Sequence, residues 1–155
     1  MHFESRRFWG GTFHHIGHRL LRMHGEVIDL DRRFTILDSG EADSFLRDST
    51  ETFDRSFFKD RTHPRPGPLS DIISMSRNTC LTFLETVTRY FPHHGHIVER
   101  LPAIAEAYSK AKRKHQVVDY DDLLVYWLQL FEKAPEIAEI YQKRFCHTLV
   151  DEYQD

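Results

Sequence analysis

The sequence of 155 residues has little cysteine, no long apolar run and no excess of positive charge. Its two cysteines, Cys80 and Cys146, lie far apart and in no CxxC or other metal-binding spacing, so a disulfide has little support. Both lie in apolar helical patterns, and we predict buried free thiols. No stretch approaches the ~18 apolar residues of a membrane span. The first residues also lack the apolar core of a signal peptide, so we expect a cytoplasmic protein with no membrane partner.

The charge balance argues against nucleic-acid binding through bulk positive charge. The formal net charge is −3, so any nucleic-acid site must be local. Hydrophobic residues make up 40% of the chain and charged residues 29%, which is typical of a soluble globular protein. No internal repeat or low-complexity segment is present.

Hydrophobic periodicity predicts a mainly helical chain with short extended segments near its ends. The extended runs are expected over 7–13, 34–37 and 147–150, and the prolines and glycine of 60–68 predict a loop. Helices are expected over 14–24, from Asp38–Ser39, from Ser70 to about Tyr90, over 97–115, from Asp119, and from Pro135. In the longest of these, Cys80 and Leu84 belong to the predicted apolar stripe.

Two groups of side chains invite a functional interpretation. The first is a basic run at a predicted helix end, formed by Lys110, Lys112, Arg113 and Lys114. We interpret it as a solvated face that complements the helix dipole, with duplex phosphate contact as the alternative. The second is the histidines, which include His14 with His18 and a cluster after Pro92. No nearby cysteine or third helical ligand completes a zinc set, so we predict uncoordinated imidazoles.

The most informative stretch is the acidic end, where an apolar strand candidate runs into Asp151 and Glu152. Strand ends in α/β sheets place side chains over a ligand crevice. There a first carboxylate can hold Mg²⁺, and a second can position or deprotonate an attacking water. A solvated acidic tail is the alternative, because short motifs often match by chance.

Three segments, taken in order, resemble one protein family. Val150-Asp-Glu-Tyr-Gln-Asp155 resembles motif II of the UvrD/Rep-type superfamily 1 DNA helicases, whose pattern is V-D-E-[FY]-Q-D. Gly11-Thr-Phe-His14, followed by Arg19-Leu-Leu-Arg22, resembles the T-F-H segment of that family. Val118–Leu124 resembles its D-[FY]-x-[DE]-L-L segment, whose plain structural role is a capped amphipathic helix. The resemblance extends over nearly the whole chain but depends on its two ends.

The resemblance implies a mainly α fold. A helical inserted subdomain would accompany short β segments left from a parallel α/β, RecA-like motor domain of the P-loop NTPase class. Residues 1–37 would be a partial motor-domain segment with the T-F-H motif, 38–132 the inserted subdomain, and 133–155 the return to the motor domain ending in motif II. Parallel strands need cover on both faces, so we expect the ends to be poorly stabilised or rearranged while the middle helices pack.

The resemblance also implies a function, that of an internal fragment of an ATP-dependent 3′–5′ DNA helicase. Such an enzyme couples ATP hydrolysis to translocation on single-stranded DNA and to duplex unwinding, in repair or replication restart. By this resemblance Asp151 holds Mg²⁺, Glu152 activates the water, and Gln154 couples the nucleotide state to DNA. The single strand would contact the T-F-H residues Thr12, Phe13 and His14. ATP and Mg²⁺ would act in the intact parent, with single-stranded and duplex DNA and the rest of the helicase polypeptide as partners.

The sequence also departs from the family pattern, because it holds no GxxxxGK[ST] phosphate loop and no glutamine motif. That loop supplies the backbone N–H cradle and the lysine that bind ATP phosphates. We therefore predict that the isolated chain binds no nucleotide tightly, hydrolyses no ATP and unwinds no DNA. A non-enzymatic helical DNA-binding or adaptor module is the alternative function, and the helicase subgroup stays open.

Overall fold

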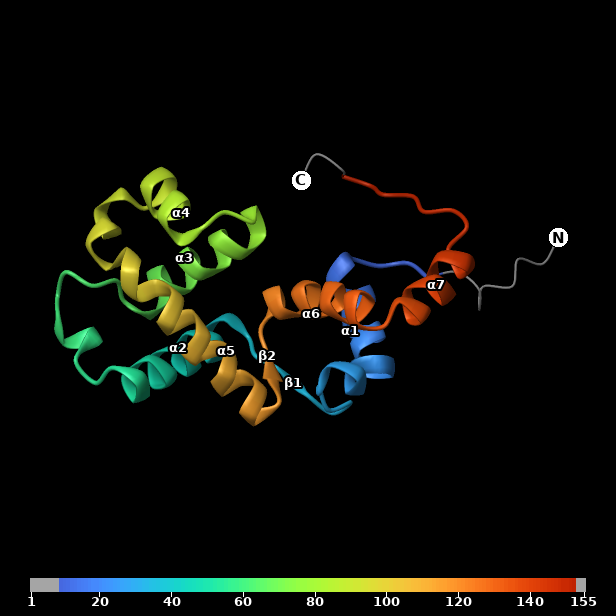
Figure 1. The fold of residues 1–155 in the computed structure, drawn as a ribbon, viewed down its shortest axis with the longest axis horizontal. Helices are drawn as coiled ribbons and strands as arrows, with labels where there is room; N and C mark the ends of the chain where they lie inside the picture. Colours follow the sequence, from blue (N-terminus) through green and yellow to red (C-terminus); the bar gives the residue numbers. More distant parts are fainter. Residues whose placement is uncertain (1–8, 153–155) are drawn as a thin grey trace. The chain divides into compact units, whose positions relative to one another are not determined.

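The structure is a computed structural model that describes residues 9–152, and these residues fold into two compact units (Figure 1). One unit is Arg33–Leu123, called here the helical unit. The other, called here the terminal unit, combines the described residues up to Arg32 with those from Leu124 onward. The middle of the chain therefore forms a body of its own, while segments from its two ends fold together.

The helical unit is built from helices and one minimal sheet. Its elements are β1 (Thr35–Ile36), α2 (Ser39–Phe53), η3 (Phe57–Lys59), α3 (Pro66–Thr79), α4 (Phe83–Tyr90), η4 (Pro92–Arg100), α5 (Leu101–His115), β2 (Val117–Val118) and the start of α6 (Tyr120–Lys133). Buried side chains from six of these elements form one core, which consists of Leu46, Phe57, Leu69, Ile72, Ile73, Val87, Ile97, Leu101, Ile104 and Tyr108. The predicted packing of the middle helices is thus observed.

The only sheet in the described part of the chain is a parallel pair of two-residue strands, β1 and β2. Thr35 is paired with Val117 and Ile36 with Val118, and the Leu37 amide donates to the Val118 carbonyl at 2.8 Å. This confirms the extended run predicted at 34–37. The pair joins the segments that lead into α2 and α6.

Several predicted helix starts are confirmed by their caps. Asp38 accepts a hydrogen bond from the Glu41 amide at 2.8 Å, and the Glu41 carboxylate accepts one from the Asp38 amide at 2.9 Å. Pro102 lies in the first turn of α5, and Pro135 opens α7 (Pro135–Arg144). Proline suits the first turn because its missing N–H would find no helical partner there.

The helix predicted from Ser70 to Tyr90 is wrong, because the chain forms two helices there. Pro66 opens α3 earlier than predicted, so the loop predicted over 60–68 ends at Arg65. Cys80 then adopts a left-handed backbone with φ of 55°, and Thr82 caps α4. Cys80 lies in the break and is exposed, so the predicted burial of its thiol is wrong. The break also changes the register of α4, so Leu84 is 63% exposed and the predicted stripe is wrong at both of these positions.

The terminal unit contains α1 (Phe13–His24), η2 (Gly25–Ile28), the later part of α6, and α7. The predicted helix over 14–24 is confirmed as α1, and Gly25 caps it. The buried apolar side chains of this unit are Leu20, Leu21, Ile28, Leu30, Tyr126, Leu130, Ala134, Ile137 and Tyr141. Within residues 9–152, no helix combines the length and apolar character needed to cross a bilayer.

The two terminal strands are not observed where the structure describes them. Phe13 is the first residue of α1 rather than part of an extended run. Residues 147–150 form no strand, and Leu149 is 97% exposed. Cys146 is exposed as well, which corrects the second predicted burial of a thiol. A strand needs a hydrogen-bonded neighbour, and the described residues place none beside these segments.

Candidate functional site

The T-F-H segment forms the start of α1. The Thr12 hydroxyl caps the helix by accepting a hydrogen bond from the His15 amide at 3.2 Å. Phe13 is 59% exposed, and His14 is half-buried. The cap therefore fixes the turn from which an exposed aromatic ring projects. A ring in this position is free to stack on a planar group such as a base.

The acidic pair lies in the segment after α7. Asp151 and Glu152 are both exposed, and the Asp151 carboxylate accepts a hydrogen bond from the Glu152 amide at 3.0 Å. Adjacent carboxylates are oxygen ligands of the kind Mg²⁺ prefers, so their chemistry fits the predicted ion. Gln154 lies outside the described residues. Across residues 9–152 no set of three or more histidine, cysteine, aspartate or glutamate side chains is placed to hold a metal.

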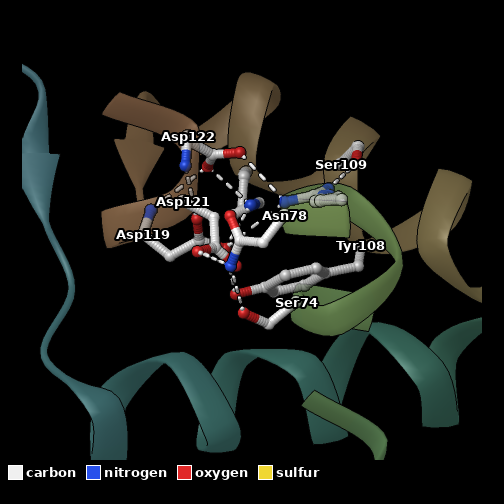
Figure 2. A network of polar contacts seen from close by, with 9 residues as sticks. Ser74, Asn78, Tyr108, Ser109, Asp119, Asp121 and Asp122 are labelled. Carbon is white, nitrogen blue, oxygen red and sulfur yellow. Dashed lines mark hydrogen bonds and ion pairs between the residues drawn. The ribbon is translucent and has the colours of Figure 1, made fainter. Parts of the chain in front are cut away.

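A buried polar network surrounds the D-[FY]-x-[DE]-L-L segment, as Figure 2 shows. Asp119 and Asp122 cap α6 reciprocally: each carboxylate accepts a hydrogen bond from the other residue's amide, at 2.9 and 3.1 Å. The Lys112 ammonium lies 2.5 Å from a carboxylate oxygen of each aspartate. Lys112 is 0% exposed, so its predicted place on a solvated basic face is wrong. A periodic pattern cannot distinguish a solvated lysine from one that meets two carboxylates.

The same network joins three helices. Arg77 of α3 lies 3.3 Å from Asp122 and donates a hydrogen bond to the Ser109 hydroxyl of α5 at 2.9 Å. The Tyr108 hydroxyl donates to Asp119 at 3.0 Å. At the exposed side, Asn78 donates to Asp121 at 3.2 Å and also to Ser74, as the labelled residues show (Figure 2).

The electrostatics of this network follow from burial and from its charges. Burial raises the pKa of Asp122 above its ordinary value, although the Lys112 ammonium opposes that rise. Burial also acts to raise the pKa of Asp119, but Lys112 and several hydrogen bonds outweigh it and hold that pKa below the ordinary value. Burial and the nearby aspartates raise the pKa of Tyr108. Two cations face two carboxylates, so the network is balanced and serves to fix the helices.

A second cluster, which the sequence reasoning missed, joins α1 to α7 within the terminal unit. The Trp9 ring packs edge-on against Phe145 at a centroid distance of 5.2 Å, and it packs against the Tyr141 ring at 5.7 Å with the two planes tilted by 55°. His24 and the Tyr141 hydroxyl share a hydrogen bond of 2.9 Å. The helix that begins at the T-F-H segment is therefore packed against the helix that leads to the acidic pair. Aromatic residues spread over 9–145 gave no local pattern that could predict this contact.

Comparison with known proteins places this chain in a family. The family described as the UvrD/REP helicase N-terminal domain matches residues 2–155. An ATP-dependent DNA helicase PcrA of Staphylococcus aureus is 30% identical over 154 residues, which cover 98% of this chain and 20% of that relative. A PcrA of Staphylococcus epidermidis gives the same identity and coverage, 30%, 98% and 20%. The chain thus spans about a fifth of the length of these curated relatives. It belongs to the UvrD/REP helicase N-terminal domain family.

Proposed function

We propose that this chain is the part of an ATP-dependent 3′–5′ DNA helicase that carries the T-F-H segment, the helical inserted subdomain and motif II. The observation that carries the proposal is the family match over residues 2–155, which ends in a complete motif II string. The cofactors are ATP and Mg²⁺, and the partners are single-stranded and duplex DNA and the remainder of the helicase polypeptide. The helical unit, Arg33–Leu123, would supply most of the inserted subdomain predicted over 38–132.

In this proposal the two acidic residues, Asp151 and Glu152, have different roles in ATP hydrolysis. Asp151 would hold Mg²⁺, which supplies positive charge to phosphate oxygens when bound. Glu152 would orient a water and accept its proton, and Gln154 would couple the nucleotide state to the DNA-binding elements. The exposure of Asp151 and Glu152 supports these roles, because both carboxylates are accessible to a ligand.

The T-F-H residues would contact the single strand. Phe13 supports this role, because its ring is 59% exposed at the start of α1 and base stacking needs an accessible aromatic face. His14 would add a polar contact to sugar or phosphate. Thr12 would cap α1 by accepting the His15 amide hydrogen bond and would donate its own hydroxyl proton to sugar or phosphate.

The isolated chain would be inactive as an ATPase, because its sequence holds no GxxxxGK[ST] phosphate loop. The test compares the purified chain with the full-length helicase that contains it, by phosphate release with Mg²⁺ and single-stranded DNA. We expect turnover only from the full-length protein. There, Glu152→Gln should lower kcat roughly 100-fold or more, the range of a lost general base. Glu139→Gln is the control, because Glu139 is an exposed residue of α7 paired with Lys143.

Two results would count against this function. Magnesium-dependent turnover by the isolated chain would show that the missing loop is not needed. Unchanged kcat in full-length Glu152→Gln would remove the role given to that carboxylate.

The alternative is a non-enzymatic helical DNA-binding or adaptor module. It is favoured by one observation, that the helical unit has its own apolar core and its own balanced polar network. This alternative predicts DNA binding that falls with salt but is the same with and without ATP. Any nucleotide effect on DNA affinity in the full-length protein would count against it.

A further inference from the structure

Two arginines from different helices converge on one tryptophan ring in the terminal unit. The guanidinium carbon of Arg19, in α1, lies 3.9 Å from the centroid of the Trp9 ring. The guanidinium carbon of Arg144, in α7, lies 5.0 Å from the same ring. The two guanidinium carbons are therefore at most about 9 Å apart. Both also lie near Tyr141, where burial raises the pKa of the hydroxyl and the two arginines act to lower it.

In the part of the chain that the structure describes, these two arginines have no carboxylate partner to balance their charge. Within residues 9–152 neither arginine forms an ion pair with a carboxylate, although both are exposed. Neighbouring cations of the same unit do, since Lys143 is paired with Glu139 at 3.5 Å and Arg32 with Glu26 at 3.0 Å. A local excess of positive charge is thus concentrated at the Trp9 ring in a chain whose net charge is −3. An anion is the ligand that such a pair attracts.

The way these arginines are held leaves their hydrogen-bond donors available. A guanidinium over an aromatic ring is attracted through its planar face, so its N–H groups around the edge stay free to donate. In a salt bridge, by contrast, some of the guanidinium N–H groups already donate to the carboxylate. Arg19 and Arg144 can therefore each present a two-donor edge, the arrangement that binds a phosphate best.

The neighbouring residues indicate which anion would bind. Arg19 belongs to α1, the helix that begins with the exposed Phe13 ring. A nucleic-acid strand offers bases for such a ring and closely spaced backbone phosphates for a pair of cations. We propose that Arg19 and Arg144, held on the Trp9 ring, bind backbone phosphate of single-stranded DNA beside the T-F-H segment. This assignment rests on the helicase function proposed above and adds two contacts to it.

Trp9 is a positioning residue in this arrangement. Its ring contacts Arg19, Arg144, Tyr141 and Phe145, so it holds the two cations where α1 meets α7. Trp9→Leu would remove the aromatic face and release both arginines while leaving their charges. Binding should then weaken although the net charge is unchanged.

The test is equilibrium binding of the 155-residue chain to fluorescent oligothymidylate, measured by anisotropy over a series of salt concentrations. Each phosphate contact contributes about 0.7 to the slope of log affinity against log salt for a single strand. We expect Arg19→Gln and Arg144→Gln each to weaken binding and to lower that slope by about this amount. The matched control is Arg89→Gln, which removes the same charge from an arginine 5.3 Å from the Tyr90 ring in the helical unit. Circular dichroism checks that every variant is folded.

The outcomes separate this inference from the proposed function. If Phe13→Ala weakens binding while Arg19→Gln and Arg144→Gln behave like Arg89→Gln, the phosphate site is refuted and the DNA contact of the T-F-H segment stands. If the wild-type chain binds no oligothymidylate, both DNA assignments fail, whereas the role of Glu152 is still judged by turnover of the full-length protein. Inorganic phosphate at matched ionic strength is the comparison ligand. If Arg19→Gln and Arg144→Gln lower the affinity for inorganic phosphate but leave the affinity for oligothymidylate unchanged, the nucleic-acid assignment is overturned.

Discussion

Replacing Lys112 by methionine should remove a large part of the stability of the helical unit. The Lys112 side chain is fully buried, and its ammonium lies 2.5 Å from both Asp119 and Asp122. Methionine is similar in length but uncharged, so the variant leaves the buried Asp122 and the mostly buried Asp119 without their shared cation. Removing one partner of a buried ion pair costs roughly 3–5 kcal/mol. Arg77 stays 3.3 Å from Asp122 and 3.8 Å from Asp119, so we expect the lower end, about 3 kcal/mol.

The assay is urea unfolding followed by circular dichroism. With a dependence on urea of about 2 kcal/mol per molar, a loss of about 3 kcal/mol lowers the midpoint by about 1.5 M. Lys110→Met is the matched control, because it makes the same change in the same helix. Lys110 is 74% exposed and is paired at 2.6 Å with Glu106, which is also on the surface. The urea midpoint of Lys110→Met should therefore be close to that of the wild type.

The loss should also depend on pH. The pKa of Asp119 is lowered in the folded state, so its stabilisation is present above its unfolded pKa and is lost as the pH falls through the folded value. The pKa of Asp122 is raised, so its contribution is present below its unfolded pKa and is lost as the pH rises through the folded value. The Lys112 ammonium lowers both pKa values, so both rise in the variant. The difference between wild type and Lys112→Met should therefore be largest at neutral pH and should shrink towards acidic pH.

Two results would refute this reasoning. A midpoint shift no larger than that of Lys110→Met would show that the buried charge pair contributes little. An equal loss at neutral and acidic pH would show that the cost comes from packing, because protonated carboxylates no longer need the lysine.

Three further predictions concern single features of the fold. Asp38→Ala removes the cap of α2 and should cost about 1 kcal/mol in the same urea assay, whereas Asp48→Ala on the exposed face of that helix should cost much less. Cys80→Gly should be more stable than Cys80→Ala by up to about 1 kcal/mol, because residue 80 has a φ of 55°, and equal midpoints would contradict that backbone. Both cysteines should react with a thiol reagent in the folded protein nearly as fast as in urea, since both are exposed, and slow reaction of either would contradict its placement.

The helix starts were predictable because they depend on neighbouring residues. In both capping pairs, a carboxylate accepts a hydrogen bond from the backbone amide three residues later. The pairs are Asp38 with Glu41 and Asp119 with Asp122. Pro102 and Pro135 mark first turns by their fixed backbone angle. These signals lie within one turn of the chain, so the rest of the fold is not needed to read them.

The break at Cys80 was missed because periodicity continues across it. Ile73 and Val87 are both buried, as one long stripe predicts, but they belong to separate helices. The capping pair Thr82 and Glu85 was present in the sequence and is the signal that could have revealed the break. An apolar period near 3.6 residues therefore predicted correctly that this segment is helical, but it did not reveal the boundary between α3 and α4.

The sequence by itself determined the family, most helix starts and the residues of the two motifs, because each is encoded in a short string. Tertiary structure alone decided that Lys112 is buried between Asp119 and Asp122, and that Arg19 and Arg144 meet at Trp9. These contacts join residues from different helices, and their formation depends on how the apolar faces pack. The distance between two charges, and so their function, is fixed only when the helices that carry them are in place.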